Sequence, residues 1–244
     1  MHGIPRQILV RLPSVAGIDL SITNEVVLLW VAALVTFILL APACRRGNVV
    51  PRGPFQNVFE ALVQFVERQI VRDSIGAGGA RWSPFLLTLF FFILVGNLFG
   101  LVPLPQHFKS ITASLGVTAA LALIVFGVTV GINVTRHGPA GFAAKFMPSG
   151  VPVWIAVVMV PIEVISWLAR PVSLAIRLFA NMLVGHTLIF IFIGMEMAAV
   201  WFLLPLPLAG AVIMSCFEIF VAFVQAFVFT LLAGIYIKEA LAEH

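Results

Sequence analysis

Residues 152–196 read PVWIAVVMVPIEVISWLARPVSLAIRLFANMLVGHTLIFIFIGME, and this stretch decides the class of fold. It is almost entirely apolar, and it is longer than the roughly 20 residues that a helix needs to cross a bilayer. We therefore expect it to tilt strongly, to break, or to consist of two pieces. Ionisable residues nevertheless occur within it: Glu163, Arg170, Arg177, His186 and Glu196. Ionisable side chains inside a span mark a functional site by default.

The composition of the whole chain agrees with a membrane protein. Its 244 residues are 61% hydrophobic and 10% charged, whereas a soluble domain is about half apolar and a quarter charged. This excludes a soluble enzyme and a disordered chain. The 14 Lys+Arg exceed the 10 Asp+Glu too slightly for a nucleic-acid-binding surface. Cys44 and Cys216 have no metal-site spacing, so we expect buried hydrophobic cysteines and neither metal nor cofactor.

Long gaps between charged residues predict the membrane helices. We expect an all-α polytopic membrane protein, a single membrane domain over 1–244, with about five spans. The predicted spans are 23–44, 84–104, 111–135, 152–196 and 202–240. The resulting organisation is an external segment 1–22, helix 23–44, a cytoplasmic segment 45–81, a helical hairpin 84–135 and a long helical hairpin 152–240.

Arginine and lysine placement predicts the orientation. Segment 45–81 is rich in arginine, and the loop after the third span carries Arg136 and Lys145, whereas the loop between them has only Lys109. The positive-inside rule then puts 45–81 in the cytoplasm, the N-terminus outside and the C-terminus inside.

Residues 55–72 (FQNVFEALVQFVERQIVR) carry an apolar stripe at helical spacing, with charged residues on the other face. We expect an amphipathic helix that lies in the cytoplasmic interface rather than spanning. A solvated linker helix is the alternative, because the stripe is short.

Arg177 is the hardest ionisable residue to explain by packing, because arginine at mid-bilayer costs about 2.5–3.5 kcal/mol on insertion scales. If 152–196 and 202–240 form an antiparallel hairpin that turns near 201, Arg177 lies level with Gln225 and His186 lies level with Glu218. Gln225 can hydrogen-bond Arg177 but cannot neutralise it. The missing carboxylate is therefore expected from another chain.

The remaining polar residues predict a route for protons or cations that the arginine interrupts. Glu163 lies on one side of Arg177, and the His186/Glu218 pair lies on the other. A histidine titrates near neutral pH, and a neighbouring carboxylate shifts its pKa. His186 could instead be a packed histidine bonded to a backbone carbonyl, and Arg170 and Glu196 could extend to the interface.

These residues also carry a family resemblance. RPVSLAIRLFANMLVGHTLI (170–189) resembles the signature segment of the a subunit of F-type ATP synthases, called subunit 6 in mitochondria. PIEVISWLARPVSL, EIFVAFVQAFVFTLLAGIY and LFFFILVGNLFGLVP extend the resemblance over roughly residues 20–244.

The resemblance implies the proton-channel stator of the Fo sector, with two half-channels that serve the carboxylates of a rotating c-ring. Family members lay the last two helices strongly tilted along that ring. Arg177 then corresponds to the essential arginine that separates the half-channels and faces the ring carboxylate. The outer path would contain Asn181, His186, Glu218 and Gln225, and Glu163 would belong to the inner path. Here the imidazole is at position 186 and the acid is at position 218, which is the order of mitochondrial-type chains. Many bacterial members have the two groups the other way round.

The resemblance also implies partners and a location. The partners are the c-subunit ring, the peripheral-stalk b subunits, other ATP synthase subunits and membrane lipid, with no nucleic acid. The location is a bacterial cell inner membrane, with the mitochondrial inner membrane as the alternative. We expect no catalytic residues in this chain, because it has no phosphate-cradling loop or nucleophile constellation. A stand-alone ion-coupled secondary transporter is the alternative, although it predicts an internal repeat that the sequence lacks.

Overall fold

The computed structural model describes residues 8–10, 21–44, 53–101, 111–144, 146, 153–198 and 205–242. The chain is an all-α membrane protein. Its helices are α1 (Asn24–Cys44), α2 (Pro54–Val66), the π-helix η1 (Glu67–Ile75), the 3₁₀ helices η2 (Gly76–Arg81) and η3 (Ile111–Ala113), α3 (Ser83–Phe99), α4 (Leu115–Ala144), α5 (Val153–Ala198) and α6 (Pro205–Leu241). Within the described residues, α1, α4, α5 and α6 are long and apolar enough to cross a membrane, and α3 is a shorter apolar helix.

The five apolar runs of the sequence all form helices, within a few residues of the predicted bounds at most ends. The main difference is at the end of α4, which continues past the expected position 135 to Ala144. Gly138 interrupts it with φ 70° and ψ 171°, and Pro139 follows. A left-handed glycine before a proline ends the straight part of the helix, and the remaining residues form a separate short turn.

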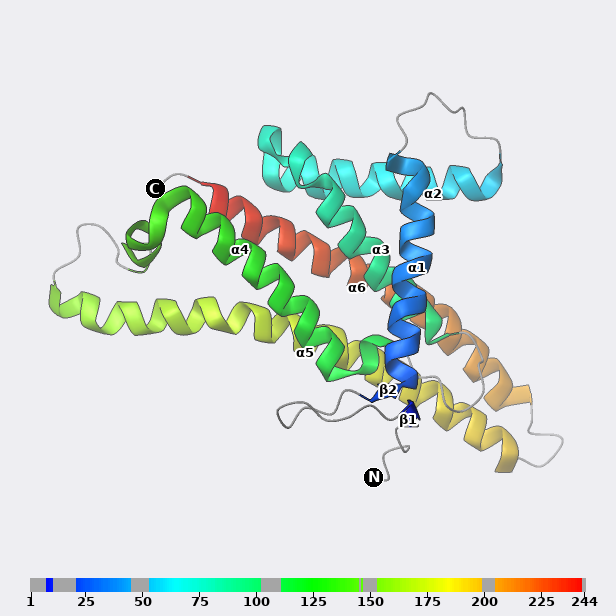
Figure 1. Cartoon of the computed structure of the whole chain (residues 1–244). Helices are drawn as coiled ribbons and strands as arrows, with labels where there is room; N and C mark the ends of the chain where they lie inside the picture. The colour runs from blue at the N-terminus through cyan, green and yellow to red at the C-terminus, as the bar shows by residue number, and fades with distance from the viewer. Residues whose placement is uncertain are drawn as a thin grey trace.

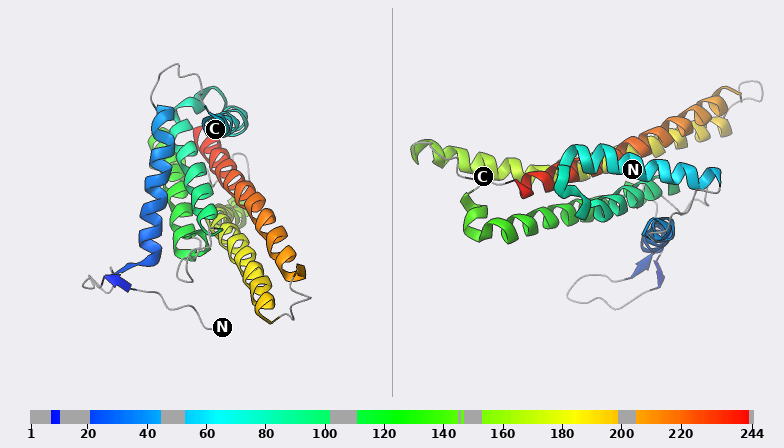
Figure 2. Two further views of the ribbon diagram at one scale, coloured as in Figure 1. Left: turned by 90° about the vertical axis from the view of Figure 1, so that its right-hand side faces the viewer. Right: turned by 90° about the horizontal axis from the view of Figure 1, so that it is seen from above.

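The two long helices tilt rather than break. α5 contains 46 residues and α6 contains 37, which at 1.5 Å per residue gives about 69 and 56 Å, against a hydrocarbon core of roughly 30 Å. Pro161 and Pro171 lie inside α5, yet the helix is continuous. Figure 1 shows α5 running crosswise to α1, and the view from above in Figure 2 shows the later part of α5 beside α6, with the first part of α5 extending past the end of α6.

The amphipathic segment is an integral part of the packed structure. α2 begins with Pro54 at its first turn and continues directly into η1, whose Ile70, Val71 and Ser74 are buried. Val66 and Ile70 are 0% exposed, and the two helices cross one end of the bundle in Figure 1. The later part of the apolar stripe is therefore covered by protein, whereas Val58 near its start is 61% exposed. The position of this segment at the cytoplasmic interface stays a prediction.

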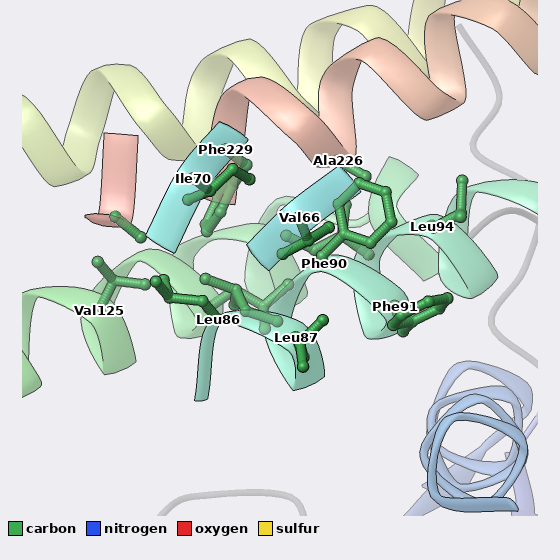
Figure 3. Packing of buried hydrophobic residues seen from close by; sticks show 14 of the residues in the cluster. Val66, Ile70, Leu86, Leu87, Phe90, Phe91, Leu94, Val125, Ala226 and Phe229 are labelled. Carbon is green, nitrogen blue, oxygen red and sulfur yellow. The ribbon is translucent and has the colours of Figure 1, made fainter. Parts of the chain in front are cut away.

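A core of large and small side chains joins α2, η1, α3, α4 and α6. Figure 3 shows Val66 and Ile70 facing Phe90 and Leu86 of α3, with Phe229 of α6 beside them. On α6 the buried stripe is dominated by small residues: Ala222, Ala226, Ala233, Gly234 and Ala240. Small residues let helix backbones approach closely, which drives helix association where lipid removes the hydrophobic contribution. This stripe holds α6 against α3 and η1.

Two details differ from the sequence-based expectation. A short antiparallel pair, β1 (Ile8–Val10) and β2 (Ile22–Thr23), lies in the segment expected to be an external extension, with Ile8 paired to Thr23. Cys216, expected to be buried, is exposed on α6, because it lies on the face of the helix away from the small-residue stripe. The side chain of Cys44 lies outside the described part.

Candidate functional site

α5 and α6 form an antiparallel pair in which polar side chains of α6 contact α5 at three levels. Arg170 forms an ion pair with Glu239 near the end of α6. Further along α5, Asn181 Nδ2 donates a hydrogen bond of 2.7 Å to Gln225 Oε1. Beyond this, the Gly185 backbone approaches the side chain of Glu218. The long hairpin thus brings residues from both halves of 152–240 together.

The observed register differs from the predicted one near the arginine. The sequence places Arg177 level with Gln225, whereas the structure places Asn181, one helical turn further along α5, against Gln225. The prediction at Glu218 is closer, because Gly185, the neighbour of His186, contacts Glu218. The difference arises because the two helices cross at a tilt, so one register does not hold along their full length.

Glu218 is buried in the packed part of the structure. Its side chain is 2% exposed. A Cβ added at Gly185 would lie 2.9 Å from Glu218 Oε1 and 3.1 Å from Cδ. A larger residue at this position would press on the carboxylate where it now lies, so Gly185 leaves room for an acid between the helices.

Gln225 is a second buried polar group on the same face of α6. It is 3% exposed, and it lies seven residues from Glu218, which places both on one side of the helix. Its oxygen accepts from Asn181, whereas its Nε2 is buried and has no hydrogen-bond partner within the described residues. A buried amide donor without a partner costs free energy, and such groups are concentrated at functional sites or where water enters.

Asn97 of α3 extends this polar region, and the sequence reasoning missed it. It is 1% exposed, and its Nδ2 donates a hydrogen bond of 3.1 Å to the carbonyl oxygen of Ala222, between Glu218 and Gln225 on α6. Its Oδ1 is buried and has no partner within the described part of the chain. The sequence signal was a single amide in the apolar run FFFILVGNLF, which is easily overlooked beside charged residues.

Arg177 lies at the surface of the helix pair. Glu163, Arg170 and Arg177 recur every seven residues on α5 and therefore share one side of the helix. The Arg177 and Glu163 side chains are both exposed, and neither has a hydrogen-bond or ion-pair partner in the described part of the structure. The guanidinium of Arg177 is thus presented outward, beside the buried stripe of α5 that includes Leu178 and Met182.

The other predicted ionisable residues have different outcomes. Arg170 is paired with Glu239 and lies over the ring of Tyr236, with 5.4 Å from Cζ to the ring centroid. Its extension to the membrane interface stays a prediction. The side chains of His186 and Glu196 lie outside the described part, so the pairing of His186 with Glu218 stays a prediction. No group of three or more potential metal-ligating side chains occurs among the described residues.

Together these features define a multi-pass membrane protein in which polar side chains are buried between two long tilted helices and an arginine is exposed beside them. The model of the ATP synthase A chain family matches residues 26–238. The chain belongs to this family.

Curated relatives extend over nearly the whole chain. ATP synthase subunit a of Magnetococcus marinus is 42% identical over 234 residues, which cover 94% of this chain and 88% of that protein. ATP synthase subunit a of Neorickettsia sennetsu is 37% identical over 97% of this chain and 96% of that protein. ATP synthase subunit a of Anaplasma marginale is 41% identical, with 97% and 95% covered.

Proposed function

We propose that this chain is the proton-translocating stator subunit of the Fo sector of a bacterial ATP synthase. It would provide two half-channels to the carboxylates of a c-ring, separated by Arg177. The observation that carries the proposal is the exposed guanidinium of Arg177, which has no partner in the described part of the chain. An arginine in a membrane helix needs a counter-charge or water, and an acid on another subunit would supply that counter-charge.

The two sides of Arg177 differ in a way that suits two separate paths. On one side, Asn97, Glu218 and Gln225 are buried among α3, α5 and α6. The exposed Asn181 is hydrogen-bonded to Gln225 at the edge of this polar region. In the other direction along α5, toward its N-terminal end, Glu163 is exposed on the same face of the helix as Arg177. We assign the buried region, together with His186, to the outer half-channel and Glu163 to the inner one.

Proton transfer would proceed in a fixed order. A proton enters from outside through Glu218 and His186 and neutralises a c-ring carboxylate, which can then turn into lipid. After nearly a full rotation the carboxylate returns to Arg177 and loses its proton toward Glu163. The guanidinium stabilises the deprotonated acid and prevents a direct leak. Each charge that crosses is driven by about 2.3 kcal/mol per 100 mV.

The same assignment specifies partners and topology. The c-ring would cover the Arg177 side of α5 and α6, and the b subunits of the peripheral stalk and other ATP synthase subunits would complete the stator. We place the chain in the bacterial inner membrane with its N-terminus outside and its C-terminus in the cytoplasm. The subunit would conduct protons without catalysing ATP chemistry itself.

The test is ATP-driven proton pumping by vesicles that contain the whole ATP synthase. Arg177→Ala should abolish pumping while the complex still assembles. Arg177→Lys should fail nearly as completely, because a compact ammonium does not reproduce the planar guanidinium. Arg136→Ala, which changes an exposed arginine at the end of α4, is the matched control and should pump normally. Wild-type pumping by either Arg177 variant would exclude the proposed role.

A further inference from the structure

The half of α5 that precedes the buried stripe has few apolar anchors. The buried residues of α5 within the described part are Leu174, Ala175, Leu178 and Met182. From Trp154 to Ser173 every described side chain is exposed or half-buried. Helix packing therefore fixes the middle of α5, and other contacts must hold the part that lies before Leu174.

Two neighbouring side chains provide those contacts. Trp167 packs against three aromatic rings at and after α4, with its centroid 4.4 Å from that of Phe126 and 5.3 Å from that of Phe142. One turn later, Arg170 forms the ion pair with Glu239 and lies over the ring of Tyr236. Trp167 thus ties α5 to α4, and Arg170 ties α5 to the last turns of α6.

The Arg170 side chain lies among residues of three helices. It lines a pocket with Trp167 of α5, Tyr236 of α6 and Thr129 of α4. Its side chain is 31% exposed and that of Glu239 is 42% exposed, which leaves the pair partly shielded from solvent.

The Arg170–Glu239 pair and the Asn181–Gln225 hydrogen bond lie on either side of Arg177 along α5. Arg170 precedes Arg177 by seven residues, about 10 Å along the helix, and Asn181 follows it by four, about 6 Å. Both contacts reach α6. The segment of α5 that presents Arg177 is therefore joined to α6 at both ends by polar contacts.

We propose that Arg170 is a positioning residue, which acts through Glu239 and Tyr236 to hold the Arg177 segment of α5 at a fixed distance and rotation relative to α6. This inference rests on the proposed function, in which the exposed guanidinium must meet a passing carboxylate at one place. Without the ion pair, the part of α5 before Leu174 loses its contact with the last turns of α6, and the packed residues from Leu174 to Met182 must hold the rotation of Arg177 alone.

The chemistry of the pair makes the inference specific. A lysine at position 170 keeps the charge for Glu239 but loses the planar face that stacks on Tyr236. Exchanging the two charges keeps their attraction, whereas removing one partner leaves a partly buried charge alone. A role that depends on attraction between the residues thus predicts recovery in the exchanged protein.

The experiment measures structure and activity separately in the intact ATP synthase in vesicles. Spin labels on cysteines at Ser166 and Lys238, both exposed, report the distance between α5 and α6 after the native cysteines are replaced. Arg170→Ala and Glu239→Gln should broaden this distance distribution and lower pumping about fivefold. Arg170→Lys should keep more than half of the pumping, and the exchange of Arg170→Glu with Glu239→Arg should restore a narrow distribution.

A control variant and three outcomes decide the question. Arg68→Ala, which removes an exposed arginine of η1, should change neither the distance between the two spin labels nor the rate of pumping. An unchanged distance distribution in Arg170→Ala would overturn the inference. An exchanged protein no better than the single variants, or Arg170→Lys as impaired as Arg170→Ala, would also overturn it. The distance measurement does not depend on the role of Arg177, so failure of the proposed function through Arg177→Ala would be recognised separately.

Discussion

Replacing Gly185 with alanine tests whether the close contact between α5 and Glu218 matters for function. The new Cβ would lie 2.9 Å from Glu218 Oε1, 3.1 Å from Cδ and 3.3 Å from Cγ. Ordinary van der Waals contact begins at 3.4 Å, so the carboxylate oxygen must retreat by about 0.5 Å. Glu218 is 2% exposed, and its surroundings leave little space for this movement.

The expected magnitude follows from the cost of overpacking. Adding a methyl group to a packed region costs about 1–3 kcal/mol when side chains must leave their preferred positions. Part of this cost falls on the proton-transfer step, because the Glu218 carboxylate must be in its present position to pass on a proton. If about 1.4 kcal/mol acts on that step, its rate falls tenfold. We therefore expect Gly185→Ala to pump protons at roughly one tenth of the wild-type rate.

The assay is ATP-driven acidification of vesicles, with two glycine variants as controls. Gly194→Ala lies on the same helix, where an added Cβ meets nothing within 4 Å, and should pump normally. Gly210→Ala would press on the ring of Phe192 at 2.7 Å, so it overpacks the same helix pair away from the carboxylate. Glu218→Asp combined with Gly185→Ala shortens the acid by one methylene and should recover part of the lost pumping.

Two results would refute this reasoning. If Gly185→Ala pumps as well as Gly194→Ala, the contact with Glu218 has no functional consequence. If Gly210→Ala is as impaired as Gly185→Ala, general loosening of the helix pair explains the loss, and the position of the carboxylate does not.

Further predictions concern the register and the end of α4. Cysteines that replace Asn181 and Gln225 should form a disulfide on mild oxidation faster than cysteines that replace Arg177 and Gln225, because the 2.7 Å hydrogen bond joins the first pair. Gel analysis of the cross-linked subunit measures both rates. The reverse order would contradict the observed register. Gly138→Ala should lower the free energy of unfolding by about 1–3 kcal/mol, because φ 70° with ψ 171° is a backbone conformation that is essentially restricted to glycine. Gly131→Ala, with no positive φ and open space around it, is the control, and equal stability of the two variants would contradict the strain.

The sequence was sufficient for the helices because charged residues are rare and bound the apolar runs. The gap between Glu25 and Arg45 contains almost all of α1, and the charge-free stretches 197–217 and 219–237 together cover most of α6. The length of α5 predicted that it would tilt, break or consist of two pieces, and the structure has one continuous helix. The periodicity of the amphipathic segment 55–72 could not predict its partner, because the same apolar stripe can pack on lipid or on protein. The structure shows that Ile70 packs on α6 at Gly234.

The sequence predicted which residues belong to the candidate site better than it predicted the contacts between them. Charges in apolar runs drew attention to Arg177 and Glu218, because burying such groups is costly. The bond between Asn181 and Gln225 depends on how two tilted helices cross, and a linear register cannot provide this. Asn97 was missed because its partner is a backbone carbonyl 125 residues away, and backbone partners leave no trace in the sequence.

The two prolines inside α5 have a consequence for hydration. Proline has no N–H, so Pro161 and Pro171 cannot donate to the carbonyl groups four residues earlier, at Val157 and Trp167. A carbonyl without its helical donor is costly in hydrocarbon and must be satisfied by water or by another polar group. Val157 is 68% exposed in this chain, so no neighbouring helix covers this residue. We expect the first half of α5 to attract water through its own backbone, even before any ionisable side chain contributes.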